Sequence, residues 1–501
     1  MKRRRGVLIG LALTAVVALA TAVGGGLGAP LGLGLGAGTV YADVVTGTWS
    51  SAFQVQNLGS AQATVQLAYY EQGGNLVATQ TVTINASQSK TFLPGAPDTD
   101  TDPTKQVTDM KVPAGFNGSV QLSSDQKIAA IANINTADYK VADDYGGVTT
   151  PSSKVILPII QKKLSSQQWS TAIFIQNTTS SQVTGTIVFF NGTGSAAGQE
   201  VGRASLTIPA NGRISLDQSK NEPASANIPD NWYGSAVITT GSDTQQVAAV
   251  VVQSNGQSVL SYPGLTDADS ANTIYAPLIQ NENDSCSHWS GLQVVNVSNV
   301  ATDVILKVGG VEISRRTGLG QYQAGNWLTP ADNSGFKGLD RVVAGTFVAS
   351  NPNAKLVGIV NLNRRDTYGC APKGPNRLTG YPTLASGYRM FTTGTQQAYA
   401  PLLDYYNDGW WAGFQVMNVG SSATNAQLYV NGSPVGSKIP IDAGKSWTYY
   451  RPQDYGLTTT GKFVGSGYVV ADSGGEIVGV VNRTKFVAGS ENQLTYEAFK
   501  P

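Results

Sequence analysis

The residues best suited to chemistry are few in this sequence, and they do not form the groupings that catalysis needs. Hydrolytic triads need a base beside a nucleophile, and histidine is the usual base. The chain has one histidine, His288, which we interpret as a surface residue at the start of a strand. Carboxylates could pair as they do in glycoside hydrolases, but no acidic pair recurs along the chain. We therefore expect no catalytic residue and no enzyme activity.

The stretch that contains Asp98, Asp100 and Asp102 is the one candidate metal site. Carboxylates that alternate with threonine could converge on calcium, a hard cation that prefers oxygen ligands, if the loop curls. The stretch lacks the glycine and the distal glutamate of an EF-hand loop, so an ordinary exposed acidic loop is the competing interpretation. Calcium is the only cofactor that the sequence leaves open.

Cys286 and Cys370 are the only cysteines. An exported protein meets an oxidising compartment, in which such a pair forms a disulfide. A metal site would need more ligands than this pair and His288 supply. We predict a disulfide between Cys286 and Cys370, which mass spectrometry of non-reduced peptides would detect.

Adjacent aromatic residues suggest a binding site, because exposed rings stack on sugars or anchor a partner protein. Neighbouring residues of a strand point to opposite faces, so each aromatic doublet is expected to place one ring in the core and one at the surface. The candidate binding residues are Trp411, Tyr406 and Tyr450. The doublets are Trp232-Tyr233, Tyr405-Tyr406, Trp410-Trp411 and Tyr449-Tyr450.

A sequence pattern recurs four times along the chain, with a period of about 120 residues. In each copy a tryptophan opens a short apolar strand that ends in asparagine. We expect these residues to form the core of each repeat. They are Trp49, Trp169, Trp289 and Trp410, followed by Asn57, Asn177, Asn296 and Asn418.

Two further columns recur after the asparagine. The first is an apolar residue that leads into a turn, as in Ile84-Asn85-Ala86-Ser87, with Tyr322-Gln323-Ala324-Gly325 as the weaker equivalent in the third copy. The second is a closing hairpin whose return strand is continuously apolar, as at 247–253. Strands of that kind are covered on both faces or lie centrally in a sandwich.

No segment carries apolar residues at helical spacing, and about seven short strands fit each copy, which is the size of an immunoglobulin-like sandwich. The pattern resembles the CARDB-like class of bacterial Ig-like modules, in which a strand ending in asparagine precedes a small turn. The resemblance implies fold and location rather than activity. We therefore predict an all-β protein of four tandem Ig-like antiparallel β-sandwich domains.

The predicted boundaries are a signal peptide at 1–42 and repeats at 43–150, 151–268, 269–388 and 389–501. Copies two to four open with a lead strand that contains Pro158, Pro277 or Pro401, and proline marks a sheet edge. The linkers are predicted at about 145–153, 263–272 and 383–397. They are short, so we expect an extended chain of domains with limited bending.

The N-terminus has the layout of a secretory signal, with Met1-Lys2-Arg3-Arg4-Arg5 followed by an apolar run from Val7 to Val23. Small residues permit cleavage after Ala22 or after Ala42, and we favour Ala42. The alternative is an uncleaved membrane anchor. No second apolar stretch is long enough to span a bilayer, so the rest of the chain is expected in the extracellular space or at the cell surface.

The overall charge argues against a polyanionic partner, because 33 basic residues balance 32 acidic ones. We expect no nucleic acid partner. The absent chemistry, the export signal and the repetition favour a non-catalytic structural or adhesive surface protein, as a stalk, envelope lattice or filament component. The alternative is a carbohydrate-binding surface protein that uses its exposed aromatics. The expected partners are other surface proteins, further copies of the chain or an extracellular glycan.

Overall fold

The computed structural model describes residues 13–19 and 49–501, with gaps at 137–140, 193, 221–227, 257, 284–287, 330, 332–333, 365–383, 408, 458–460 and 486–491. The described chain is built from β-strands whose pairs are antiparallel except for Ser89–Leu93 with Val107–Asp109, with the short 3₁₀ helices η1 (Asp267–Asp269) and η3 (Pro452–Tyr455) between them. This confirms the all-β class and the sandwich architecture. No helix in the described part is long and apolar enough to cross a membrane.

The strands of repeats 1 and 2 each form two facing sheets. Those of repeat 1 are β1 (Leu13–Leu19), β2 (Trp49–Asn57), β3 (Ala63–Glu71), β4 (Leu76–Ile84), β5 (Ser89–Leu93), β6 (Val107–Asp109), β7 (Gly118–Ser124), β8 (Ile128–Thr136) and β9 (Ala142–Gly146). Those of repeat 2 are β10 (Lys154–Lys162), β11 (Ser170–Asn177), β12 (Val183–Asn191), β13 (Glu200–Ile208), β14 (Arg213–Asp217), β15 (Trp232–Thr240), β16 (Val247–Ser254) and β17 (Val259–Pro263). In repeat 2 the sheet orders are β10-β15-β12-β13 and β14-β11-β16-β17.

Repeats 3 and 4 follow the same order, but their long lead strands pair at one end with the second sheet and so join the two sheets. Repeat 3 contains β18 (Thr273–Asn283), β19 (His288–Asn296), β20 (Thr302–Val308), β21 (Val311–Leu319), β22 (Ala324–Leu328), β23 (Val342–Ala349), β24 (Leu356–Arg364) and β25 (Ala385–Arg389). Repeat 4 contains β26 (Gln397–Asn407), β27 (Trp410–Asn418), β28 (Thr424–Val430), β29 (Ser433–Ile441), β30 (Ser446–Tyr449), β31 (Phe463–Ala471), β32 (Ile477–Lys485) and β33 (Asn492–Glu497).

Each sandwich core follows from alternation along the strands. In β3, Val65, Leu67 and Tyr69 are buried, while the residues between them face outward, as the two-residue period of a strand requires. The facing sheet supplies Phe53 and Phe92, whose rings stack with centroids 4.5 Å apart. Apolar side chains from both inner faces therefore form one core per repeat.

The recurring asparagine is buried and holds two turns together by hydrogen bonds to their backbone groups, and we call it the asparagine pin. Asn57 is fully buried, and its Nδ2 donates to the carbonyl oxygens of Ala61 at 2.7 Å and Ile84 at 3.0 Å. Its Oδ1 accepts from the Gly59 N–H at 2.8 Å. The same three kinds of bond recur at the other copies, from Asn177, Asn296 and Asn418. One side-chain amide thus fixes both the turn after β2 and the turn between β4 and β5.

The tryptophan column is less uniform. Trp49 is 7% exposed and lies in the core of repeat 1, whereas Trp169 packs near Leu260 at the side of its repeat. Trp289 and Trp410 are only half-buried. Trp49 and Trp410 are the first residues of their strands, Trp289 is the second, and Trp169 directly precedes β11. The tryptophan marks the strand start, while the asparagine carries the conserved contacts of the repeat.

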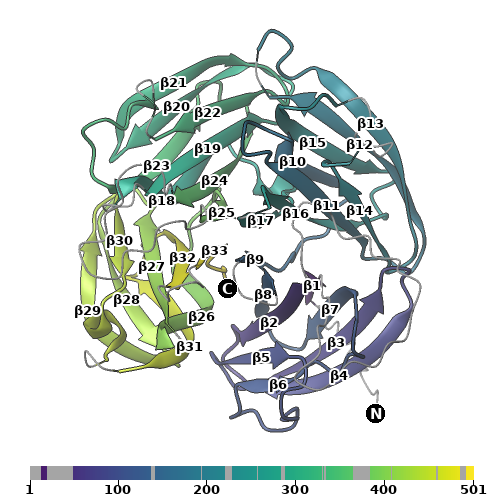
Figure 1. Ribbon diagram of the computed structural model, residues 1–501. Coiled ribbons are helices and arrows are strands. Elements are labelled where there is room, and N and C mark those ends of the chain that lie inside the picture. Colours follow the sequence, from purple (N-terminus) through teal and green to yellow (C-terminus); the bar gives the residue numbers. More distant parts are fainter. Residues whose placement is uncertain are drawn as a thin grey trace, which may run out of the picture.

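The four repeats form a closed ring, and the expectation of an extended chain is wrong. Figure 1 shows the repeats around a common centre with β9, β17, β25 and β33 innermost. Each of these strands contacts the next, and β33 of the last repeat contacts β9 of the first. Each repeat lies at an angle to its neighbour instead of in line with it.

The repeats interlock through their cores. The lead strand of one repeat contacts the second sheet of the next, as β10 does with β19 and β24. β18 contacts β27 and β32, and β26 contacts β2 and β8 of repeat 1. Accordingly, Val295 and Val357 of repeat 3 belong to the apolar cluster of repeat 2, and Ile131 of repeat 1 belongs to that of repeat 4. Apolar burial continues around the whole ring.

The recurring turn also joins neighbouring repeats. Ser87, Asn211, Tyr322 and Gly444 occupy equivalent positions and all have positive φ, between 55° and 71°. Asn211 reaches Gln121 of repeat 1, and the Tyr322 ring packs on Phe190 of repeat 2 with centroids 4.4 Å apart. In the third copy the turn is therefore Leu319-Gly320-Gln321-Tyr322, three residues before the alignment that the sequence suggested.

Of the innermost strands β9, β17, β25 and β33, the first three overlap the predicted linkers at 145–153, 263–272 and 383–397, and the last lies within predicted repeat 4. Each carries a buried tyrosine: Tyr145, Tyr262, Tyr388 and Tyr496. In repeat 2 the Tyr262 hydroxyl donates to the Ile159 carbonyl at 2.7 Å and accepts from the Ile159 N–H at 3.1 Å. Tyr388 and Tyr496 bind the residues after Pro277 and Pro401 in the same way. In each of these three repeats the tyrosine hydroxyl provides hydrogen bonds to the N–H and C=O groups of the residue after the proline, which the bulge leaves without a partner strand.

Replacement of Asn177 by alanine should destabilise the ring by about 2–3 kcal/mol, because several buried backbone groups lose their partner. The matched control is Asn425→Ala, an exposed asparagine that bonds Asp472 at 2.7 Å, for which we expect less than about 0.5 kcal/mol. Urea unfolding monitored by tryptophan fluorescence measures both. Equal midpoints for the two variants would contradict the role of the pin.

Candidate functional site

The Asp-rich loop of repeat 1 surrounds a positively charged group, the side-chain ammonium of Lys90. Lys90 is fully buried, and its Nζ donates to the carbonyl oxygens of Thr99 at 2.7 Å and Asp102 at 3.0 Å. Burial lowers the pKa of Lys90, and the carboxylates of Asp100 and Asp102 oppose that shift. The loop curls as a calcium loop would, around an ammonium group.

The three carboxylates of this loop point to separate partners. Asp98 pairs with Lys111 at 2.6 Å. Asp100 accepts from Gln80 and Thr108, both at 2.8 Å, and Asp102 accepts from the Thr104 hydroxyl at 2.6 Å. In the part of the chain that the structure describes, no cluster of three or more His, Cys, Asp or Glu side chains could hold a metal.

The other polar candidates are placed differently from expectation. His288 opens β19 and is only 7% exposed, so its interpretation as a surface residue is wrong. It is buried because its strand is paired with β24 from the first residue onward. Cys286 and Cys370 lie outside the described residues, and their disulfide stays a prediction.

The aromatic doublets mostly divide between core and surface. Tyr405 is buried and Tyr406 is 42% exposed, while Tyr449 is buried and Tyr450 is 53% exposed. Trp410 and Trp411 differ, because both are half-buried. Arg483 covers the Trp410 ring with its guanidinium carbon 4.9 Å from the ring centroid.

The structure brings two of the three candidate binding residues together. The ring centroids of Tyr406 and Trp411 lie 4.4 Å apart. The ring of the buried Tyr405 packs against both, with centroid distances of 5.0 Å to Tyr406 and 5.3 Å to Trp411. Tyr406 also has a φ of 52°, so its backbone turns out of the β26 ladder. Tyr450 follows β30. Tyr406 and Trp411 form an aromatic pair at the surface of repeat 4.

The centre of the ring is held by a carboxylate that the sequence did not single out. Asp143 in β9 is fully buried. Its Oδ2 accepts from the N–H of Ser261 in β17 and from the Ser261 hydroxyl at 2.6 Å. Its Oδ1 accepts from the hydroxyl of Ser386 in β25 at 3.0 Å. One side chain of repeat 1 therefore contacts both repeat 2 and repeat 3.

The next residue connects repeat 1 to repeat 4. Oδ2 of Asp144 lies 3.1 Å from Nη1 of Arg483, whose Nε donates to Oδ2 of Asp404 at 2.6 Å. One guanidinium faces two buried carboxylates, so its positive charge is shared. Burial raises the pKa of Asp144 to about 7, while Arg483 opposes the rise. Burial, with the adjacent Asp144, raises the pKa of Asp143 well above its usual value. We call Asp143, Asp144, Asp404 and Arg483 the hub.

A pocket of about 330 Å³ lies between repeats 1, 3 and 4 at one end of the central strands. Its charged side chains are largely paired with one another. Arg389 lies 3.4 Å from Glu497 and 3.8 Å from Asp269, and Lys500 donates to Thr393 at 2.6 Å. These contacts link the last strand of repeat 4 to repeat 3 and close this end of the ring.

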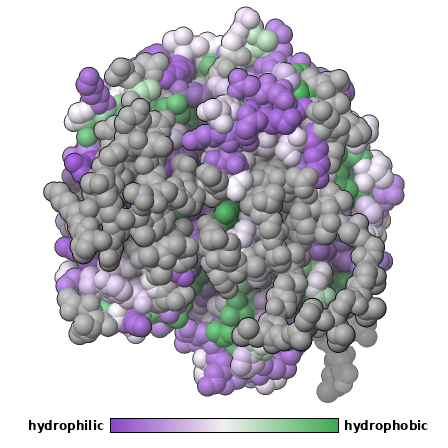
Figure 2. Space-filling model, viewed as in Figure 1, coloured by the Kyte–Doolittle hydropathy of each residue, from purple (hydrophilic) through white to green (hydrophobic). Residues whose placement is uncertain are grey.

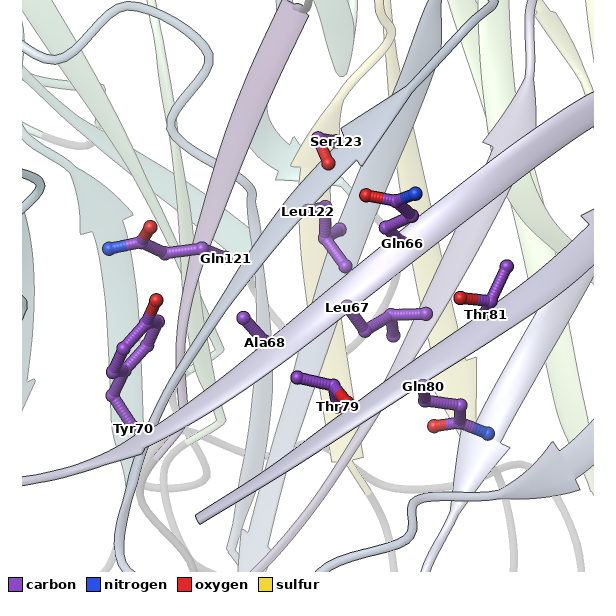
Figure 3. Close-up of a pocket in the computed structure, with 10 residues that line it drawn as sticks. All are labelled: Gln66, Leu67, Ala68, Tyr70, Thr79, Gln80, Thr81, Gln121, Leu122 and Ser123. Carbon is purple, nitrogen blue, oxygen red and sulfur yellow. The ribbon is translucent and has the colours of Figure 1, made fainter. Parts of the chain in front are cut away.

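A second hollow, of about 540 Å³, lies on repeat 1 over strands β3, β4 and β7. Figure 3 shows its polar side chains, with Tyr70 and Gln121 toward one end and Gln80 and Thr81 toward the other. Amides, hydroxyls and one aromatic ring line it, and no charged residue is among them. We call this hollow the repeat 1 groove.

The repeat 1 groove lies at a position that bulky aromatic side chains fill in repeat 4. Ala68 faces Gln121 across the sheet. The equivalent pair in repeat 4 is Tyr429 and Tyr468, whose stacked rings lie 4.8 Å apart and continue to Tyr399 at 5.1 Å. Three tyrosines thus fill in repeat 4 the space that stays open in repeat 1.

The visible surface is mainly polar. On the face shown in Figure 2, the described apolar residues form small groups between hydrophilic ones. Such scattered groups are ordinary for a protein in water. The aromatic pair of repeat 4 and the repeat 1 groove are therefore the most distinctive candidate binding surfaces in the described chain.

The hub predicts that stability falls as pH rises. Burial raises the pKa of Asp143 in the folded state, so its contribution to stability is full below its unfolded pKa and is lost as pH rises through the folded pKa. The same holds for Asp144, whose folded pKa is about 7. Asp143→Asn keeps a neutral hydrogen-bonding group and should be more stable than the wild type at pH 8 but similar at pH 4. Urea midpoints at pH 4, 6 and 8 measure this. A constant difference between the two proteins would argue against a protonated hub.

No protein family model matches the chain, and no curated protein matches its sequence at a significant level.

Proposed function

We propose that this chain is an exported, non-catalytic surface protein that acts as a structural or adhesive component of the cell envelope. The observation that carries the proposal is the closed ring, whose buried polar groups serve contacts between repeats. Asp143 joins three repeats, and Arg483 joins repeat 4 to repeat 1. Polar groups held in this way give rigidity and are not available to a substrate.

Other features support the same proposal. The N-terminal segment has the charge and hydropathy of an export signal. The resemblance to CARDB-like modules of secreted surface proteins agrees with such a location. The interlocked cores favour a compact particle, because each repeat buries apolar surface on two neighbours. A stalk would need the repeats in line, so a lattice or platform component fits the closed ring better.

Cell fractionation and electron microscopy of the purified chain test this function together. We expect the protein in the envelope or medium fraction, and we expect discrete ring-shaped particles or an ordered array of them. Recovery only in the cytoplasmic fraction would contradict export. Elongated rods of separated domains would contradict a rigid platform, even if the protein were exported.

A second candidate function is recognition of a neutral glycan. The repeat 1 groove favours it, because amides and hydroxyls supply hydrogen bonds to sugar hydroxyls while the Tyr70 ring offers an apolar face. The aromatic pair Tyr406 and Trp411 is the alternative location. Calcium would not be required at either place.

A glycan array with three variants separates these surfaces. Tyr70→Ala should abolish saturable binding if the sugar occupies the repeat 1 groove, and Trp411→Ala should abolish it if the aromatic pair binds. Ser205→Ala is the matched control, since Ser205 holds in β13 of repeat 2 the exposed position that Thr81 holds in β4. A tenfold loss of affinity corresponds to about 1.4 kcal/mol. Equal binding by all variants, or none by the wild type, would remove this candidate.

A further inference from the structure

The first strand of repeat 1 comes from an unexpected part of the chain. In repeats 2 to 4 the lead strands β10, β18 and β26 pair with β15, β23 and β31. The same edge in repeat 1, beside β7, is taken by β1, from Leu13 opposite Ser124 to Leu19 opposite Gly118. We call this edge the repeat 1 slot. β1 lies inside the apolar run from Val7 to Val23 that the sequence predicts to be the export signal.

β1 lacks the feature that defines the other lead strands. Their pairing shifts at the proline, between Leu157 and Ile160 in β10, with equivalent shifts in β18 and β26. The pairing of β1 with β7 runs without a shift over all seven residues. β1 therefore presents no bulged peptide toward the inner strand of its repeat.

Tyr145 is the inner-strand tyrosine that would contact a bulged lead-strand peptide in repeat 1. Its counterparts Tyr262, Tyr388 and Tyr496 each bind the N–H and C=O of the residue after the lead-strand proline. Tyr145 is 3% exposed, yet its hydroxyl makes no hydrogen bond to the described part of the chain. In repeats 2 to 4 the bulged lead-strand peptide lies at this hydroxyl, whereas the unshifted β1 supplies no such peptide in repeat 1.

The chain contains a second segment that matches a lead strand. Ala29-Pro30-Leu31 repeats the tripeptides Ala276-Pro277-Leu278 and Ala400-Pro401-Leu402 of repeats 3 and 4. It follows Ala22, the first of the two predicted cleavage points. We propose that, in the chain cleaved after Ala22, the segment around Ala29-Pro30-Leu31 replaces β1 in the repeat 1 slot. This proposal rests on the proposed export of the chain.

The register follows from the other repeats. Ala400 lies opposite Gly467 in repeat 4, so Ala29 lies opposite Val120 in repeat 1, and Gly28 lies opposite Gln121. Pro30 provides the bulge, and the Leu31 peptide meets the Tyr145 hydroxyl. Residues 32–48 join this strand to β2, which is ample because only residues 163–169 join β10 to β11 in repeat 2.

An empty slot would be costly. The strand β7 would present unpaired N–H and C=O groups along a sheet edge, and the fully buried Val120 and Leu122 of the core would lose their cover. Cleavage after Ala42 would remove both β1 and the replacement segment. The slot therefore also distinguishes between the two cleavage points and favours Ala22.

Hydrogen exchange of two purified chains tests the occupant. The chains contain residues 23–501 and 43–501. We expect slot-facing amides of β7 to exchange at least about tenfold more slowly in the longer chain. The strand β15 is the internal control, because its lead strand β10 is present in both chains. Equal exchange of β7 in the two chains would overturn the proposal.

A disulfide tests the register. In the 23–501 chain, Gly28→Cys with Gln121→Cys should give a linked peptide after mild oxidation, because cross-strand pairs lie within disulfide reach. The control pairs Gly38→Cys with Gln121→Cys, which the register places apart. Equal yields from the two pairs would contradict the register.

Amino-terminal sequencing of the exported protein tests export and cleavage independently of which segment occupies the repeat 1 slot. A start at Val23 supports the proposal. A start at Asp43 would leave export intact but overturn the occupant, since the segment is then removed. An uncleaved chain would contradict the cleavage, and the two purified chains would still report which segment fills the slot.

Discussion

Closure of the ring is the constraint on which the rest of the structure depends, and Asp143 is its centre. A single carboxylate accepts hydrogen bonds from Ser261 and Ser386, while the adjacent Asp144 reaches Arg483 of the last repeat. Only a closed arrangement brings these four repeats to one point. Burying carboxylates is costly unless they are paired or protonated, so the hub trades some stability at neutral pH for a single defined geometry.

The shared columns of the repeat acquire a second purpose in the ring. The asparagine pin fixes the turn after the first core strand and the turn before the next sheet, and the residue with positive φ in the latter turn then projects against the preceding repeat. A local polar contact therefore sets the geometry of an interface between domains. This explains why the turn recurs even where its sequence changes from Ser87 to Tyr322.

The sequence predicted the sandwich fold well, because alternation and the asparagine period are local signals. It did not predict the ring. The inner strands are short and lie at or beside the predicted linkers, so Asp143, Ser261 and Ser386 were not singled out, and the bond from Ser386 to Asp143 spans 243 positions. The stretch with Asp98, Asp100 and Asp102 was a candidate calcium site with an ordinary acidic loop as the alternative, and in the structure backbone carbonyl oxygens of this stretch accept from Lys90, nine positions before Thr99. The repeat 1 groove depends on Ala68 and Gln121 facing each other, which becomes visible only when strands are paired.

Ring closure also limits where recognition can occur. The surfaces that the repeats share are largely used in contacts with their neighbours, so binding must use what differs between them. In repeat 4 three tyrosines fill the outer sheet face, and in repeat 2 Tyr322 of the next repeat covers Phe190. Repeat 1 pairs Ala68 with Gln121 where repeat 4 pairs Tyr429 with Tyr468, and it keeps a hollow there. Each ring would then offer one such groove, so strong adhesion through it would require many rings side by side.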